Sequence, residues 1–154
     1  MQRRSLFAAA AALALLPFAR KSAAATPVPD KASGHRVAFH VDVNDPAVMN
    51  LTLNNIGNVS TAYSAANEPV QIELVAYGPG LHMLRSDTSP VAARIKSMTE
   101  TTPHLALSAC GNTRAGMAKS EGKEIPLLPQ AKVVPAGVVR LIELQEQGWS
   151  YIRP

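Results

Sequence analysis

The residue of this chain with the clearest chemical potential is its single cysteine, Cys110. It follows a short apolar run and precedes a segment of helical pattern, so its thiol is expected at the amino end of a helix. The free N–H groups and the dipole of such an end favour a thiolate. Asn112 and Thr113 could cap this helix or donate hydrogen bonds to a bound sulfur or anion. The alternative is a buried, inert cysteine that packs as a small apolar residue, and its position alone favours neither reading.

Further candidates follow the other apolar runs. Gly78-Pro79-Gly80 ends the second run and forces a sharp turn of the backbone, and Asn44 ends the first run. If the runs are parallel strands, their carboxyl ends share one edge of a sheet with Cys110. We therefore expect Asn44, Gly78 and Gly80 to line a binding site beside the thiol.

Two histidines need separate interpretations. His82 comes directly after the glycine turn and is the candidate base or proton donor for Cys110. A base must reach hydrogen-bond distance of its partner, so an ordinary surface histidine in a loop is the competing interpretation. His40 falls inside the first apolar run and is interpreted as structural.

Known cofactor and metal patterns do not match the chain. The glycine turn lacks the later glycine of a dinucleotide fingerprint, and there is no Walker loop, paired-histidine zinc motif or nucleophile-elbow serine. Cys110, His82 and Met83 are ligand types that copper accepts, but no dense ligand spacing supports such a site. We expect no cofactor and no metal.

The elements that must position these residues alternate between strand and helix. Strands are expected at residues 37–43, 70–77, 105–109, 132–134 and 149–152, and helices at 46–65, 81–84, 91–100, 112–119 and 137–147. This order predicts βαβ crossovers, which build a parallel sheet with helices on both faces. The length of 154 residues and the hydrophobic share of 47% fit one α/β domain with one ordinary core.

The net charge of +4 is concentrated at the start of the chain. Arg3, Arg4, Arg20 and Lys21 precede residue 26, and without them 11 basic residues face 11 acidic ones. A nucleic-acid partner is therefore not expected.

The same first 25 residues have the three parts of a cleavable signal peptide. Arg3 and Arg4 precede an apolar stretch over residues 6–18, and small residues follow at 22–25. The stretch is shorter than the roughly 20 residues that span a bilayer, so a stable membrane anchor is not expected. The paired arginines resemble a twin-arginine signal, although an ordinary secretory signal stays open. We expect a periplasmic protein with a flexible leader over residues 26–35 and a domain over 36–154.

Four motifs, in order around the cysteine, resemble the DsrE/DsrF-like family. They are Gly78-Pro79-Gly80, the run ACGNT at 109–113, the run VPAGV at 134–138 and the ending QGWSYIRP at 147–154. The resemblance implies a flavodoxin-like parallel sheet sandwiched between helices, and trimeric or hexameric assembly. In sulfur-relay members of the family a cysteine carries sulfur as a persulfide, and the motif assigns that role to Cys110. The predicted export and the lack of a second cysteine set this chain apart from the cytoplasmic relays.

Two hypotheses of function follow. In the first, the chain is a periplasmic sulfur-handling protein: Cys110 takes sulfane sulfur from a donor and holds it as a persulfide until an acceptor protein or thiol takes it. If this is catalysis, the chain is a cysteine-dependent sulfurtransferase. In the second, it is a non-catalytic oligomeric module that binds a small ligand beside Gly78 and Gly80, and Cys110 only packs.

Overall fold

The computed structural model describes residues 34–154, in which strands and helices alternate along the chain. Its five strands pair in the order β4-β3-β2-β1-β5, and every pairing is parallel. The strands are β1 (His35–Val41), β2 (Val70–Ala76), β3 (Leu105–Cys110), β4 (Ala131–Val134) and β5 (Ser150–Ile152). The predicted flavodoxin-like sandwich is confirmed. The predicted signal peptide and nearly all of the predicted leader lie outside the described residues.

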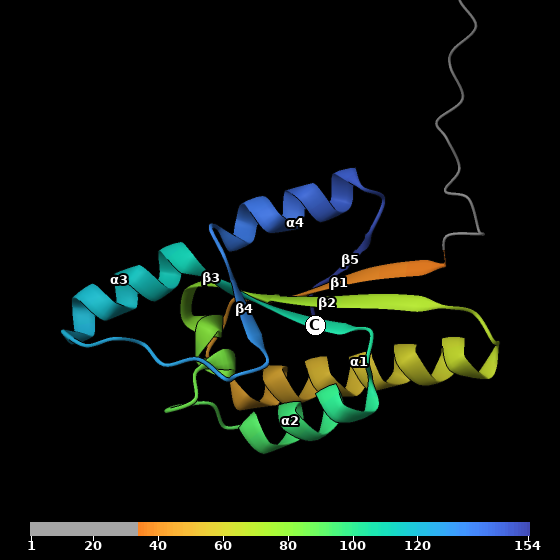
Figure 1. Cartoon of the computed structure of the whole chain (residues 1–154), viewed down its shortest axis with the longest axis horizontal. Helices are drawn as coiled ribbons and strands as arrows, with labels where there is room; N and C mark the ends of the chain where they lie inside the picture. The colour runs from red at the N-terminus through yellow and green to blue at the C-terminus, as the bar shows by residue number, and fades with distance from the viewer. Residues whose placement is uncertain (1–33) are drawn as a thin grey trace, which may run out of the picture.

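Helices cover both faces of the sheet (Figure 1). The α-helices are α1 (Pro46–Ala65), α2 (Ala92–Thr101), α3 (Gly111–Glu121) and α4 (Gly137–Glu146), and η2 (Gly78–Leu84) is a 3-10 helix. Figure 1 shows α1 and α2 below the sheet and α4 above it, with α3 extending from the end of β3. No helix within residues 34–154 combines the length and apolarity needed to cross a membrane.

The core lies on both sides of the sheet, which explains why the strands read as nearly continuous apolar runs. On one side Phe39 and Leu74 pack with Leu53 of α1 and Ile95 of α2. On the other side a smaller cluster joins the sheet to α4; its buried members are Ala38, Val75, Leu141 and Leu144. Alternate residues of β1 therefore face α1 and α4 in turn.

Local differences from the predicted elements have simple causes. β1 begins at His35, inside the predicted leader, because the His35 N–H donates to the Pro69 carbonyl at 2.8 Å and aligns the strand with β2. It ends at Val41, and Val43 lies beyond the sheet, 36% exposed. α1 is capped by Asp45, whose carboxylate accepts from the Ala47 N–H at 2.7 Å. The glycine turn and the helical stretch after it form one continuous 3-10 helix, η2.

Candidate functional site

The register of the sheet brings several polar side chains to one face at the carboxyl ends of the strands. Val41, Ala76 and Ala109 align across β1, β2 and β3 and face α1 and α2. Because side chains alternate along a strand, Cys110 and His40 project to the opposite face, which α4 covers. This edge, on the α4 side of the sheet, is called the carboxyl edge below.

The thiol of Cys110 lies where the amino ends of two helices converge. Cys110 is the N-cap of α3, and its Sγ accepts from the Thr113 N–H at 3.4 Å. Burial raises the pKa of the thiol, but the Thr113 hydroxyl and the N–H groups of Gly137, Thr113 and Asn112 outweigh it, so the pKa lies below its ordinary value. Gly137 is the first residue of α4, so α4 also supplies a donor to the thiol. The sequence analysis expected such donors from the helix after Cys110 only. Cys110 is only 5% exposed, yet its surroundings stabilise an anionic sulfur.

Two glycines make this convergence possible. A Cβ at Gly137 would lie 3.0 Å from the Tyr77 Cβ and 3.2 Å from the Cys110 Cβ. A Cβ at Gly111 would lie 3.1 Å from the Val134 carbonyl oxygen. All three distances are tighter than ordinary van der Waals contact, so glycine lets the first turns of α3 and α4 approach the thiol closely.

The glycine turn of η2 lies against the same edge. The Gly78 N–H donates to the Thr113 hydroxyl at 2.9 Å, which ties η2 to α3. A Cβ at Gly80 would lie 2.2 Å from the Val41 carbonyl oxygen, so only glycine lets η2 pack on the end of β1. The structure thus brings Gly78, Thr113 and Cys110 together, and it shows a packing role for Gly80.

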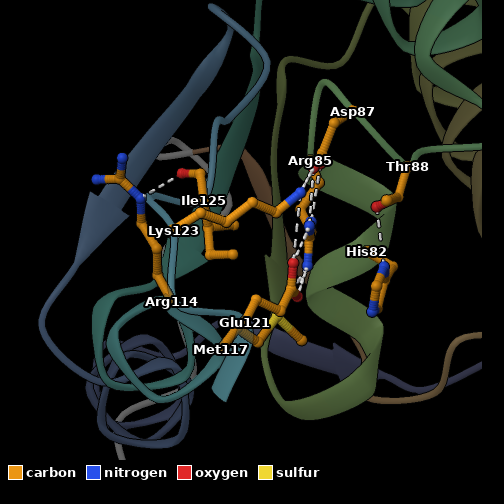
Figure 2. A network of polar contacts seen from close by, with 9 residues as sticks. All are labelled: His82, Arg85, Asp87, Thr88, Arg114, Met117, Glu121, Lys123 and Ile125. Atoms are coloured by element: carbon orange, nitrogen blue, oxygen red, sulfur yellow. Dashed lines mark hydrogen bonds and ion pairs between the residues drawn. The ribbon is translucent and has the colours of Figure 1, made fainter. Parts of the chain in front are cut away.

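The other predicted site residues lie apart from the thiol's hydrogen bonds. His82 pairs through its Nδ1 with the Thr88 hydroxyl at 2.8 Å, as Figure 2 shows. Asn44 is exposed between β1 and α1. The Asn112 side chain is exposed too, while its backbone N–H donates to the Pro135 carbonyl at 3.1 Å. Among the described residues no hydrogen bond joins the side chain of His82 or Asn44 to Cys110.

Sequence reasoning missed a row of aromatic residues at the carboxyl edge. His40, interpreted as structural, is 4% exposed and hydrogen-bonds through Nδ1 to the Tyr151 hydroxyl at 2.8 Å. Its ring stacks on Tyr77 with centroids 4.5 Å apart. We call His40, Tyr77 and Tyr151 the aromatic row. The sequence held only a weak signal for this row. His40 and Asp42 are two residues apart, as are Tyr151 and Arg153, and this spacing places each pair on one face of its strand.

Asp42 and Arg153 form an ion pair at the rim of this row. The Arg153 guanidinium donates to both Asp42 carboxylate oxygens at 2.9 to 3.2 Å, and this contact raises the pKa of Arg153. The pair links the chain after β1 to the chain after β5. It therefore fixes the last residues of the chain beside His40.

A groove of about 530 Å³ opens on the α4 side of β3 and β4. The buried Glu73 lines this groove. Its carboxylate accepts hydrogen bonds from Ser108 Oγ at 2.6 Å and from the Arg140 guanidinium at 2.7 and 2.8 Å. Burial raises the pKa of Glu73, but Arg140 and Ser108 outweigh it and the pKa is lowered. Val134, Pro135 and Ala136 line the groove and lead directly to Gly137 at the thiol.

A second charged cluster holds α3 in place (Figure 2). The Arg85 guanidinium, 1% exposed, donates to Asp87 at 2.8 and 2.9 Å and to Glu121 at 2.5 and 2.9 Å. Lys123 adds a contact of 3.2 Å to Asp87. These contacts hold the pKa of Arg85 above its ordinary value and that of Asp87 well below. Because Glu121 ends α3, the cluster anchors the end of α3 opposite Cys110.

Residues 34–154 contain no cluster of side chains suited to bind a metal ion. No group of three histidine, cysteine, aspartate or glutamate side chains there is arranged to hold an ion. Met83, one of the three possible copper ligands, is fully buried in the core.

Comparisons with known proteins agree with this architecture. The model of the DsrE/DsrF-like family matches residues 38–154, which includes the glycine turn, Cys110 and the aromatic row. Among solved structures, the chain is similar to a protein of unknown function, MTH1491 from Methanobacterium thermoautotrophicum. The two are 34% identical with a TM-score of 0.65, over 78% of this chain and 99% of that one. The search of curated proteins found no match.

Proposed function

This chain belongs to the DsrE/DsrF-like family. Because a cysteine carries sulfur in the sulfur-relay members of that family, we propose that this chain carries sulfane sulfur as a persulfide on Cys110. The observation that supports this is the convergence of α3 and α4 on one sulfur. Donors from Thr113, Asn112 and Gly137 lower the pKa of the thiol despite its burial. A thiolate is the nucleophile that sulfur transfer needs.

The chemistry needs no outside oxidant or reductant. The Cys110 thiolate attacks the outer sulfur of a polysulfide or persulfide donor, a new S–S bond forms on Sγ, and the S–S bond of the donor breaks. The shortened donor leaves with the electron pair and takes up a proton. An acceptor thiolate then attacks the outer sulfur, and Cys110 leaves as a thiolate. The same N–H donors stabilise Cys110 as nucleophile and as leaving group.

The exposure of the site favours a slim donor. Only 5% of Cys110 is exposed, so a linear sulfur chain fits the approach better than a bulky organic persulfide. Inorganic polysulfide is therefore the donor class that we propose.

We place this reaction in the periplasm. The support is the signal pattern of residues 1–25, with Arg3 and Arg4 before an apolar stretch. Expression of the full chain followed by fractionation tests this: a shortened protein in the periplasmic fraction is expected, and a full-length protein in the cytosol would contradict it.

Intact mass spectrometry tests sulfur loading. The purified domain and its Cys110→Ser variant are exposed briefly to inorganic polysulfide, with and without a later reductant. We expect a gain of sulfur on the native protein that the reductant removes, and no gain on the variant. Circular dichroism confirms that the variant is folded. Equal loading of the two proteins, or none on a folded native protein, would reject the proposal.

A second candidate function, an oligomeric binding module, is favoured by the surface around the groove. Exposed apolar side chains gather on β4 and α4: Val133 (51%), Val138 (54%), Val139 (48%) and Ile142 (49%). Lys132 and Glu143 line the same groove with opposite charges. A two-fold contact with a second copy would bury the apolar residues and pair these charges across the interface.

Light scattering tests this second candidate. A homo-oligomer is expected for the native protein, and Val139→Asp should shift it toward the monomer. If Cys110 only packs, its thiol should also resist maleimide until the protein is denatured. A monomeric native protein would reject the assembly, and rapid labelling of the native thiol would reject the packing role.

A further inference from the structure

One buried polar atom at the carboxyl edge has no partner. Among the buried side-chain nitrogen and oxygen atoms of residues 34–154, only Nε2 of His40 lacks a hydrogen bond. Folded proteins rarely leave such an atom unsatisfied, and those that do often use it in function. His40 is 4% exposed, so bulk water does not readily satisfy this nitrogen.

Groups from three strands surround the imidazole. Tyr77, after β2, stacks on its ring, and Tyr151 of β5 hydrogen-bonds its Nδ1. The Asp42 carboxylate, after β1, lies 4.0 Å from Nε2 and is held by Arg153. From α4, buried Leu141 and Leu144 close the same face of the sheet. The imidazole thus has one carboxylate near its open nitrogen, too far for a hydrogen bond.

Tyr77 connects this imidazole to the thiol. On one side Tyr77 stacks on His40, and on the other it packs against Gly137 beside Cys110. Burial raises the pKa of the Tyr77 phenol, and the negative charges of Asp42, Tyr151 and Cys110 raise it further. Tyr77 is therefore within electrostatic range of both Cys110 and the Asp42–Arg153 ion pair.

The protonation state of His40 should therefore depend on the charge at this edge. Burial lowers the pKa of His40, Asp42 opposes that effect, and Arg153 adds to it. Together these influences hold the pKa of His40 below its ordinary value. A thiolate at Cys110 would favour the imidazolium, because opposite charges stabilise each other across a poorly solvated edge.

We propose that His40 is a positioning residue for Cys110: its ring holds Tyr77 against the thiol, and a proton gained on its open Nε2 favours the thiolate across this edge. The thiol releases its proton to water and the imidazole gains one from water, so protons and charge balance. The inference deepens the proposed function, since the thiolate formed is the nucleophile of sulfur loading. It also replaces His82, the histidine that the sequence favoured, with one that the sequence had set aside.

The test is the pH profile of Cys110 alkylation by iodoacetamide, which reports thiolate and needs no sulfur donor. His40→Asn removes the titrating ring, while its amide can keep the bond to Tyr151. We expect this variant to react about three-fold more slowly than the native protein at pH values below the thiol pKa, as expected for unit charges across a partly wetted edge, and equally fast well above it. His104→Asn, exposed at the amino end of β3, is the matched control and should follow the native profile.

Three outcomes would overturn the role of His40. A ratio of native to variant rates that is constant across pH would indicate a purely structural effect. A loss in His82→Asn without one in His40→Asn would return the role to His82. If His40→Asn does not fold, the native profile decides: it must show a second ionisation besides the thiol, and a single ionisation would reject the inference.

The two proposals fail separately. Absence of sulfur loading rejects the carrier and leaves the alkylation profile interpretable. Normal loading with an unchanged profile in His40→Asn rejects only the role of His40.

Discussion

Two buried polar clusters of this domain differ in how completely their atoms are paired. Arg85 is 1% exposed and donates to two carboxylates, so its charge is fully compensated. His40 is 4% exposed, yet only one of its ring nitrogens has a partner. A saturated cluster can do little except hold elements together, whereas an open nitrogen can still gain a proton. The Arg85 cluster therefore positions α3, whereas the edge that holds His40 is the part of the molecule that we expect to react.

The largest effect should come from breaking the saturated cluster. Arg85→Met leaves Asp87 and Glu121 with only the exposed Lys123, 3.2 and 3.6 Å away, and we expect a loss of about 3 kcal/mol in the free energy of unfolding. Urea denaturation measures it. Arg94→Met is the matched control, because Arg94 makes exposed hydrogen bonds to Asn50 and Asn54 and its removal should cost less than about 1 kcal/mol. Equal losses would contradict the anchoring role of Arg85.

A methyl group at Gly137 tests how closely α4 must approach the thiol. Gly137→Ala would crowd Tyr77 and Cys110, and we expect a loss of about 2 kcal/mol together with altered alkylation of Cys110. Gly116→Ala in α3 meets no atom within 4 Å and should stabilise the protein by about 0.5–1 kcal/mol. Native-like alkylation of Gly137→Ala would show that this approach is not needed.

Glu73, Ser108 and Arg140 form a third, fully paired cluster in the groove. Its contribution to stability can be tested by varying the pH. The pKa of Glu73 is lower folded than its ordinary value of 4.5, so its contribution to stability is complete above pH 4.5 and is lost as the pH falls through the folded pKa. Glu73→Gln should cost about 1–2 kcal/mol at pH 7 and flatten the decline in acid. Thermal unfolding between pH 3 and 7 measures both. A variant with the native slope in acid would contradict the assignment.

The smallest effect is expected at the rim. Arg153 is 53% exposed, so Arg153→Met should leave the urea midpoint nearly unchanged. It should still raise the pKa of His40, because it removes a cation that lowers that pKa. NMR titration of the His40 ring measures this shift, and a fall in the His40 pKa would contradict the electrostatics described here.

The strand and helix pattern was readable from the sequence because local signals agreed with burial. Val37, Phe39 and Val41 mark a strand that is buried on both faces, and Pro46 marks the first turn of α1. The position of Cys110 at a strand-to-helix junction followed from the same pattern.

The aromatic row was not readable because topology assembles it. His40 and Tyr151 are 111 residues apart, and they meet only because β5 pairs with β1. Likewise, the Gly137 N–H lies near Cys110 because β4 pairs with β3, and this pairing brings the start of α4 next to the thiol. The histidine nearest to the glycine turn, His82, looked better placed, but η2 pairs its ring with Thr88.

The most direct test of the central claim is whether sulfur on Cys110 can be passed on. Protein loaded with polysulfide and freed of excess reagent is treated with cyanide, which removes sulfane sulfur as thiocyanate. We predict about one thiocyanate per loaded chain from the native protein, since it has one cysteine, and none from Cys110→Ser. Loaded native protein that yields no thiocyanate, or a variant that yields as much, would contradict a carrier role for Cys110.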